Sequence, residues 1–456
     1  MVTAFRMICS KDGTIGTMVM TDREVSAYME SLSAGAIQGQ GEMSLGALKE
    51  LLSRIGHPEE GLRYVHIAGT NGKGSVLAYI SMALQEAGYR VGRFFSPALK
   101  DPREKIQVGQ RPVTKAAVRE GIGLIAEAAG RMQEEGRVLP TLFETETALA
   151  FWYFKKKACD IVVLECGLGG LQDATNVIPA PEVCVFTPVS LDHTAILGKT
   201  IAEIAGVKAG ILKEGSDAVS APQTAEAAAV LEQKAGEMGI TLQYAEKPLH
   251  IRYGIKKQSF DAMGYRKMEI GLAGVYQPEN AALALAVLEA LKKRGFVLPE
   301  SKLRRAFART VWPGRFTVLQ ERPYLIMDGA HNGAAAAVLR RSLDVYFPGS
   351  SFVMILGVLR DKAYEEVLGC LVERAVQIVT LTPPENPRAL AAIDLAYAVQ
   401  RYGVQVTAAD SVEEALELAE LLSGGKLPIL ATGSLSWLGK LEDIVCSRKN
   451  YSKRNK

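Results

Sequence analysis

Residues 64–76 read YVHIAGTNGKGSV, and this stretch decides the fold expected for the chain. It opens with an apolar run of strand-forming residues and then passes through three glycines, Gly69, Gly72 and Gly74. Across residues 76–87 the apolar side chains recur at the spacing of a helix. The pattern predicts a strand, a glycine-rich turn and a helix in immediate succession.

Such a turn can bind phosphate, because its backbone N–H groups close around phosphate oxygens and the helix N-terminus adds positive potential. Lys73 is placed to reach the β- and γ-phosphates, and the hydroxyl of Ser75 to ligate Mg²⁺. The residues that this hypothesis assigns to the nucleotide are Gly69, Thr70, Asn71, Gly72, Lys73, Gly74 and Ser75.

The stretch departs from the ordinary phosphate loop, G-x-x-x-x-G-K-[ST]. No glycine stands five positions before Gly72, and Gly74 separates Lys73 from Ser75. The alternative is a glycine-rich turn with no ligand. A lysine followed by a serine at the start of a helix, within a strand–helix unit, favours the nucleotide site.

Composition describes an ordinary globular chain of 456 residues, with 48% hydrophobic and 23% charged residues. This length predicts two or three domains. A net charge of +3 gives no reason to expect nucleic acid or an anionic membrane as partner. The chain has neither an 18-residue apolar run nor a charged-then-apolar leader, so we expect a cytoplasmic protein. The six scattered cysteines form no metal-binding pair and are expected to be reduced thiols.

Short apolar strands alternate with amphipathic helices over most of the chain, which predicts a parallel sheet with both faces covered. Ligands of such sheets bind at the carboxyl ends of the strands. Polar turns follow Ala68, Phe95, Leu164 and Phe186. We therefore expect these four turns to converge on one crevice.

Two changes of pattern divide the rest of the chain. Residues 246–272 alternate in short runs, which predicts a small antiparallel sheet. The sequence WPGRF then breaks the pattern at Pro313, and a new series of strand–helix units begins. The prediction is an α/β protein with a parallel-sheet P-loop ATPase domain (1–312, with 1–20 loose) and a smaller Rossmann-like α/β domain (313–456). The basic tail CSRKNYSKRNK is expected to be structureless and solvated.

Three further residues are candidates for the site. Glu144 opens a predicted helix and His193 lies in a strand-end turn, and both can ligate metal ions that bridge a triphosphate. The alternatives are a carboxylate favoured by the helix dipole and a histidine satisfied within its turn. Lys208 lies among alanines and glycines on a helix that looks buried, although a lysine can also snorkel to the surface.

Taken together, the chain resembles the folylpolyglutamate synthase and dihydrofolate synthase family, a branch of the Mur-type amide ligases. The resemblance covers about residues 33–439. It rests on GTNGKGSV, FFSP…REKI, FET-x-T-A-x-AF, ECGLGG…DATN, LDHTAILG, AG-x-KAGI-x-K, NAALAL, WPGR, DGAHN and ATGSL, in that order.

The resemblance implies that ATP activates a carboxylate as an acyl phosphate, which then joins the amine of L-glutamate. It implies two Mg²⁺ sites with Ser75, Glu144, His193 and Lys208 as metal ligands, Lys208 being carbamylated. It also implies that Arg315 reaches the triphosphate, that Asn280 touches the adenine, and that Asp328 and His331 bind ATP or position glutamate. The implied catalytic residues are Lys73, Lys208, His193, Asp328 and His331.

Two departures from the family pattern concern the folate pocket. Ala98 stands where the family loop SPHL has histidine, and Leu171 stands where GLGGR has arginine. The choice between dihydropteroate and folate substrates therefore stays open. A Mur-type ligase for another carboxylate and amino acid is an alternative, although that branch more often has threonine at position 74. A P-loop switch protein that hydrolyses ATP slowly is another. The enzyme is expected to act as a monomer.

Overall fold

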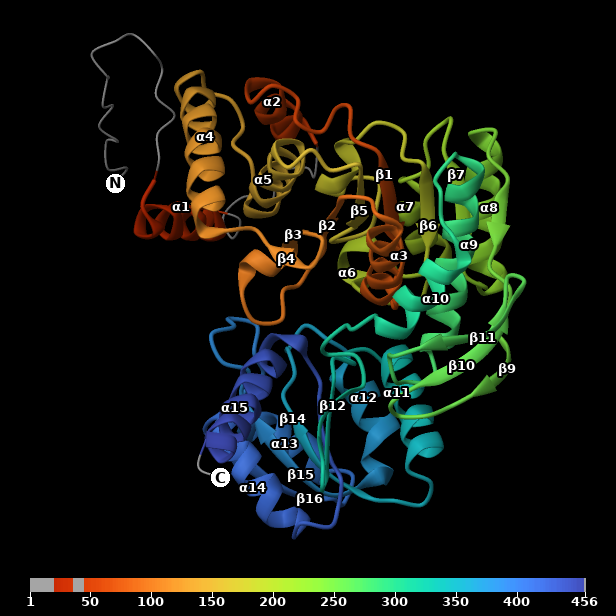
Figure 1. Cartoon of the computed structure of the whole chain (residues 1–456). Helices are drawn as coiled ribbons and strands as arrows, with labels where there is room; N and C mark the ends of the chain where they lie inside the picture. The colour runs from red at the N-terminus through yellow and green to blue at the C-terminus, as the bar shows by residue number, and fades with distance from the viewer. Residues whose placement is uncertain (1–19, 36–44, 455–456) are drawn as a thin grey trace.

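The computed structural model describes residues 20–35 and 45–454, so the predicted loose segment 1–20 lies almost wholly outside the described residues. Figure 1 shows a larger part, coloured red to green, above a smaller part that is teal to blue. The described residues form one sheet of eight strands, one of three and one of six. The predicted fold class, α/β with a large parallel sheet and a second α/β domain, is confirmed.

The eight-stranded sheet has the order β4-β3-β2-β5-β1-β6-β7-β8. The six strands from β2 to β8 in that order are parallel, while β3 and β4 are antiparallel. Their bounds are β1 Tyr64–Ala68, β2 Val91–Phe94, β3 Ile106–Val108, β4 Arg111–Pro112, β5 Ile161–Glu165, β6 Val183–Phe186, β7 Asp217–Ser220 and β8 Leu242–Tyr244.

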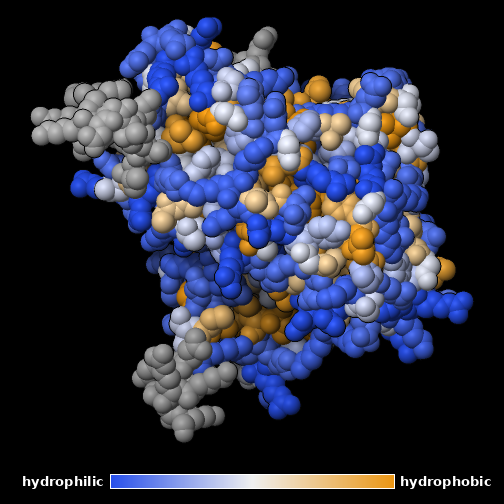
Figure 2. Space-filling view, turned by 45° about the horizontal axis from the view of Figure 1, so that its top comes forward, coloured by the Kyte–Doolittle hydropathy of each residue, from blue (hydrophilic) through white to orange (hydrophobic). Residues whose placement is uncertain are grey.

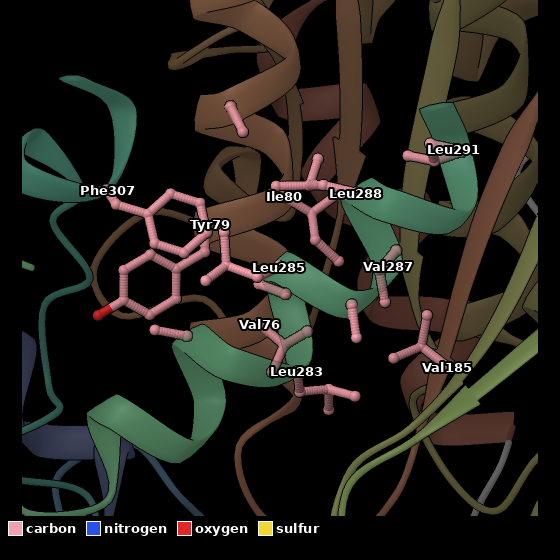
Figure 3. Packing of buried hydrophobic residues seen from close by; sticks show 14 of the residues in the cluster. Val76, Tyr79, Ile80, Val185, Leu283, Leu285, Val287, Leu288, Leu291 and Phe307 are labelled. Atoms are coloured by element: carbon pink, nitrogen blue, oxygen red, sulfur yellow. The ribbon is translucent and has the colours of Figure 1, made fainter. Parts of the chain in front are cut away.

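Successive residues of each strand point to opposite faces of this sheet, and helices cover both faces. Val65 and Ile67 of β1 pack with α3 (Lys73–Ala87), α9 (Gln277–Lys293) and α10 (Glu300–Arg309). Figure 3 shows this packing, with Val76 and Ile80 of α3 beside Leu285 and Leu288 of α9. The helices on the opposite face are α2 (Gly46–Arg54), α4 (Lys115–Glu134), α5 (Leu142–Lys156), α7 (Ile201–Ala209) and α8 (Ala225–Glu237), with α1 (Asp22–Gly35) beyond α4.

The predicted antiparallel sheet is present. It consists of β9 (Leu249–Arg252), β10 (Gln258–Ala262) and β11 (Tyr265–Ile270), in the order β11-β10-β9. Its buried residues Phe260 and Met268 join the same core as α9 and α10. The small sheet therefore extends the larger part of the molecule.

The six-stranded sheet has the order β12-β13-β17-β14-β15-β16, and only β12 is antiparallel to its neighbour. Helices α11, α12 and α13 cover one face, and α14 and α15 the other. The bounds are β12 Thr317–Glu321, β13 Tyr324–Asp328, α11 Gly333–Tyr346, β14 Phe352–Leu356, α12 Tyr364–Leu371, β15 Ala375–Leu381, α13 Ala392–Gln400, β16 Gln405–Ala409, α14 Val412–Ser423, β17 Ile429–Thr432 and α15 Leu435–Arg454.

The prediction of a structureless tail was wrong, because α15 continues to Arg454. Trp437, Leu438 and Leu441 fix the start of this helix in the core. Further along, Arg448 pairs with Glu417 and Glu420 of α14, so basic residues of the tail still have partners when helical.

Among the helices that the structure describes, none is long and apolar enough to cross a membrane. The face in Figure 2 is mostly hydrophilic, with apolar residues in scattered groups. The buried Cys159, Cys166 and Cys184 are free thiols, as expected from their apolar surroundings.

Candidate active site

A cavity of about 590 Å³ lies between the two larger sheets. All four predicted strand-end turns line it, represented by Gly69 after β1, Ser96 after β2, Gly167 after β5 and Ser190 after β6. The opposite wall comes from the second sheet and includes Asp328, His331, Lys362 and Ser434. The parallel topology brings the four turns together, as predicted from their position at strand ends.

The glycine turn between β1 and α3 has the conformation that its sequence requires. Gly69 and Gly72 have φ angles of 142° and 96°, which L side chains rarely adopt. A Cβ at Gly69 would overlap Thr187, and one at Gly72 would lie 2.6 Å from Oδ1 of Asn280. The backbone is thus close to its neighbours on one side and open to the cavity on the other.

Lys73 begins α3 and turns back over the glycine turn. Its Nζ donates to the carbonyl oxygens of Gly69 at 3.2 Å and Thr70 at 3.3 Å. The side chain of Ser75 also belongs to the cavity lining, and its hydroxyl accepts a hydrogen bond of 3.1 Å from Nε2 of Gln277. Both residues predicted to meet the nucleotide therefore stand at the cavity.

Lys208 is buried, with 4% of its surface exposed, which excludes the snorkelling alternative. Its Nζ donates to the carbonyl of Gly69 at 2.8 Å, the same oxygen that Lys73 uses. Burial, and then the nearby charge of Lys73, lower the pKa of Lys208 to about 7. Near neutral pH a large share of this amine is therefore uncharged.

Glu165, the last residue of β5, is a site residue that the sequence analysis missed. It is buried at the cavity and lies 3.8 Å from Nζ of Lys73. Burial raises the pKa of Glu165 to about 7, although Lys73 and Arg315 act in the opposite direction. A carboxylate ending an otherwise apolar strand was the available signal, within the motif ECGLGG.

Glu144 is placed differently from the prediction. Its carboxylate accepts a 2.7 Å hydrogen bond from the backbone N–H of Thr141, and the Thr141 hydroxyl accepts one from the backbone N–H of Glu144. This reciprocal pair is a capping box at the start of α5. Glu144 does not line the cavity, so the helix-start alternative describes its place in this structure.

His193 reaches the cavity from the turn after β6, beside a charged cluster that joins the two walls. The neighbouring Asp192 lies 2.9 Å from Nζ of Lys362 and accepts a 3.1 Å hydrogen bond from Asn332. Burial opposes ionisation of Asp192, but the His331 ring and the Lys362 ammonium outweigh it and hold its pKa below the usual range. Asp192 and Lys362 were also missed.

The ring of His193 belongs to the same cluster, with Nε2 lying 3.1 Å from Nζ of Lys362. Burial, followed by the charge of Lys362, lowers the pKa of His193. The histidine therefore tends to be neutral, the form in which imidazole nitrogen binds a metal ion.

Asp328, at the end of β13, is held on both carboxylate oxygens. Oδ2 accepts from the Tyr276 hydroxyl at 2.9 Å and from the backbone N–H of Phe316 at 2.8 Å, and Oδ1 accepts from the N–H of Ala330 at 2.9 Å. Burial raises its pKa. These bonds fix the turn that carries His331, whose Nδ1 lies 2.8 Å from the carbonyl oxygen of Gly329.

Arg315 and Asn280 complete the residues predicted for ATP, and both line the cavity. Asn280 is buried in the first turn of α9 and does not cap that helix, because the N-cap is Tyr276. Among the described residues, one cluster of acidic and histidine side chains is close enough together to hold a metal ion without phosphate ligands. It consists of His57, Glu59 and Glu60, and it lies between α2 and β1, outside the cavity.

Comparison with known proteins finds a family match for each of the two parts of the chain that form the cavity. Residues 67–288 match the Mur ligase middle domain, and residues 314–435 match the Mur ligase glutamate ligase domain. The dihydrofolate synthase/folylpolyglutamate synthase of Bacillus subtilis is 33% identical over 91% of this chain and 98% of its own length. Its Escherichia coli counterpart is 30% identical over 94% of this chain and 96% of its own.

Solved structures give the same result. Folylpolyglutamate synthase of Mycobacterium tuberculosis, complexed with ADP and AMPPCP, superposes with a TM-score of 0.85 at 30% identity, covering 92% of this chain and 99% of that one. A complex described as FPGS with AMPPCP and folate has a TM-score of 0.80 at 29% identity, covering 93% and 100%. The chain therefore belongs to the dihydrofolate synthase/folylpolyglutamate synthase family of Mur-type ligases.

Proposed function

We propose that this protein is an ATP-dependent carbon–nitrogen ligase that adds L-glutamate to reduced folates, to dihydropteroate or to both, through an acyl phosphate. The observation that carries the proposal is the cavity itself. Its one wall holds the glycine turn with Lys73, Lys208 and Glu165, and its other wall holds charged groups of a second domain, which we place after the hinge at Pro313. A cavity with two such walls can bring a nucleotide and a second substrate together.

The glycine turn fits a triphosphate. The turn lines the cavity, and the Cβ positions of Gly69 and Gly72 are filled by Thr187 and Asn280, so its backbone stays uncovered by side chains of its own at these two positions. The Lys73 ammonium has carbonyl partners there and a carboxylate only at 3.8 Å, which leaves it free to pair with phosphate. Arg315 would meet the same phosphates from the opposite wall.

The donor set also fits Mg²⁺. Glu165 is a buried carboxylate whose charge a divalent cation would stabilise, and His193 offers a nitrogen whose protonated form is disfavoured. Ser75 and Ser96 line the same cavity with hydroxyl groups. We propose that Glu165 and His193, with one of these hydroxyls, would hold the metal, and that Glu165 takes the role which the resemblance implies for Glu144. Bound Mg²⁺ neutralises phosphate charge and polarises the phosphoryl group under attack.

The protein's own groups then divide the work. Lys73 and Arg315 hold the transferring phosphoryl group in line with the carboxylate of the pterin substrate. The second wall positions glutamate, with His331 oriented by the turn that Asp328 fixes. Glutamate must arrive with a neutral amine, because only the lone pair attacks the acyl carbon and displaces phosphate.

We also propose that Lys208 is carbamylated, as the family resemblance implies. Three facts support this: the side chain is buried, its pKa of about 7 makes the neutral amine abundant, and its Nζ shares an acceptor with Lys73. Reaction of the neutral amine with carbon dioxide, with release of one proton, would place a carbamate anion beside Lys73 where a lysine ammonium would otherwise stand. The repulsion between the buried Lys208 and the partly buried Lys73 becomes an attraction.

The carbamate has a direct test. Lys208→Ala should be nearly inactive, and acetate or formate should restore part of its rate, whereas small amines should not. Protein equilibrated with ¹³C-bicarbonate should show a carbamate carbon resonance that is absent in Lys208→Ala. Rescue by amines, together with no such resonance in the wild-type protein, would contradict carbamylation.

The proposed activity is tested by measuring phosphate release with and without glutamate and a reduced folate, and by product mass. Stimulation that requires both substrates, with a mass increase of one glutamate, would support the ligase. Phosphate release indifferent to both would favour the switch protein. Rates measured with a panel of substrates that includes dihydropteroate and tetrahydrofolate would identify the pterin substrate. This choice is open because Ala98 and Leu171 depart from the family motifs of the folate pocket. We further propose that the enzyme is a monomer, which sedimentation of the purified enzyme would check, and that it is cytoplasmic, which cell fractionation would check.

A further inference from the structure

The indole ring of Trp312 lies where a side chain at position 74 would be. A Cβ built on Gly74 falls 2.7 Å from Nε1 of Trp312 and 2.9 Å from both Cε2 and Cζ2. Real Cβ atoms do not approach other atoms so closely, and the ring is rigid. Any larger residue at position 74 must therefore displace the ring or the first turn of α3.

The same ring also contacts the neighbouring strand. Phe95, directly after β2, meets Trp312 edge-on, with ring centroids 4.7 Å apart and an interplanar angle of 64°. The guanidinium carbon of Arg93 lies 6.0 Å from the indole centroid. Trp312 thus touches the first turn of α3 at Gly74 and the turn after β2 at Phe95, which precedes the cavity residue Ser96.

Trp312 is also the first residue of the segment WPGR that leads to the second domain. Arg315, three positions later, lines the cavity. Gly314 accepts a 2.9 Å hydrogen bond from the backbone N–H of Gly329 in the turn after β13. This short segment therefore connects the glycine turn of one wall to the Asp328 turn of the other.

We propose that Trp312 is a positioning residue for the nucleotide. Its ring, seated on Gly74, holds the hinge against the phosphate-binding turn, so that Lys73 and Arg315 face the same phosphates. Glycine at position 74 is required because the ring takes the space of a side chain. This inference rests on the proposed ATP site, but it concerns binding and not the later transfer to glutamate.

A double-mutant cycle tests the proposal through binding of AMPPCP, measured by calorimetry without folate or glutamate. Gly74→Ala should weaken binding at least tenfold in the wild-type background. In a Trp312→Leu background, where the ring is gone, the same change should cost less than about threefold. Gly130→Ala is the matched control, since Gly130 is a helical glycine with nothing within 4 Å of its Cβ position, and it should leave binding unchanged.

An equal cost of Gly74→Ala in both backgrounds would overturn the proposal, because the added methyl group would then act on the nucleotide directly. If Gly74→Ala does not fold, fluorescence provides the measurement. The chain has three tryptophans, and AMPPCP should change the emission of wild-type protein but not of Trp312→Phe. An identical change in both would contradict the proposal. Wild-type protein that binds no AMPPCP would contradict the proposed function instead.

Discussion

The two walls of the cavity are built in different ways. The wall from the eight-stranded sheet contains buried titratable groups whose pKa values are shifted in opposite directions, Lys208 downward and Glu165 upward. They lie within one domain. In the wall from the six-stranded sheet, Lys362 finds its partner in Asp192, which belongs to the other domain.

This difference indicates where each function resides. Desolvated groups held within a single domain keep their geometry whatever the position of the other domain, as pre-organised chemistry requires. Ion pairs between domains form only when the walls approach. We therefore expect changes in the first wall to affect the chemical step most, and changes in the second wall to affect closure.

The largest expected effect is that of Lys73→Ala. Removing the ammonium leaves γ-phosphate charge unbalanced, and we expect kcat/KM to fall by about 1,000-fold or more, equivalent to about 4 kcal/mol. Steady-state kinetics of glutamate addition would measure this, with circular dichroism as the control for folding. A variant that keeps more than about a tenth of the wild-type rate would contradict the role assigned to Lys73.

Much of this first wall could be predicted from the sequence. The succession of strand, glycine-rich turn and helix located the glycine turn. Because ligands bind at the carboxyl ends of parallel strands, the four turns represented by Gly69, Ser96, Gly167 and Ser190 were predicted to meet at one cavity. The choice between carboxylates could not be made from the sequence, which shows a charge at a helix start or strand end but not the direction of its side chain. Glu144 satisfied its own helix, whereas Glu165 faced the cavity.

The second wall was harder to predict for a different reason. Asp192 and Lys362 are 170 positions apart, and their pairing depends on how two separately folded sheets meet. No local pattern encodes that contact. The extension of α15 was missed because a basic run suggests solvation unless the acidic partners on α14 are known.

The next largest effect distinguishes the side chains of Glu165 and Glu144 as candidate metal ligands. Glu165→Gln should lower kcat by about 100-fold and raise the Mg²⁺ concentration needed for half-maximal rate, because a buried carboxylate is lost from the metal's surroundings. Glu144→Gln should keep activity within about fivefold and lower thermal stability slightly, since it weakens a capping box. Metal titrations of both variants would measure this. A Glu144→Gln enzyme with the larger metal defect would restore the original assignment.

A smaller effect is expected for Lys362→Met in the second wall. The change leaves Asp192 with Asn332 and His331 but without its closest cation, so closure becomes less favourable. We expect kcat to fall about tenfold while the Kd for AMPPCP changes less than about threefold. The control is Asp192→Asn combined with Lys362→Met, which should cost little more than the single change. A large loss of AMPPCP affinity in Lys362→Met would show that the lysine contributes to nucleotide binding and not only to the contact between the walls.

The last expected effect is on stability, not on activity, and concerns Lys208. Its pKa is about 7 in the folded protein against an ordinary value of 10.5. Between these values the unfolded chain binds a proton that the folded chain lacks, so the free energy of unfolding should rise with pH. Lys208→Met removes this contribution, and its stability should rise less from pH 7 to pH 9. Urea unfolding in buffer depleted of carbon dioxide would measure the difference, because carbamate formation also increases with pH. Identical slopes for both proteins would show that Lys208 keeps an ordinary pKa in the fold, and the neutral amine on which the carbamate depends would be scarce.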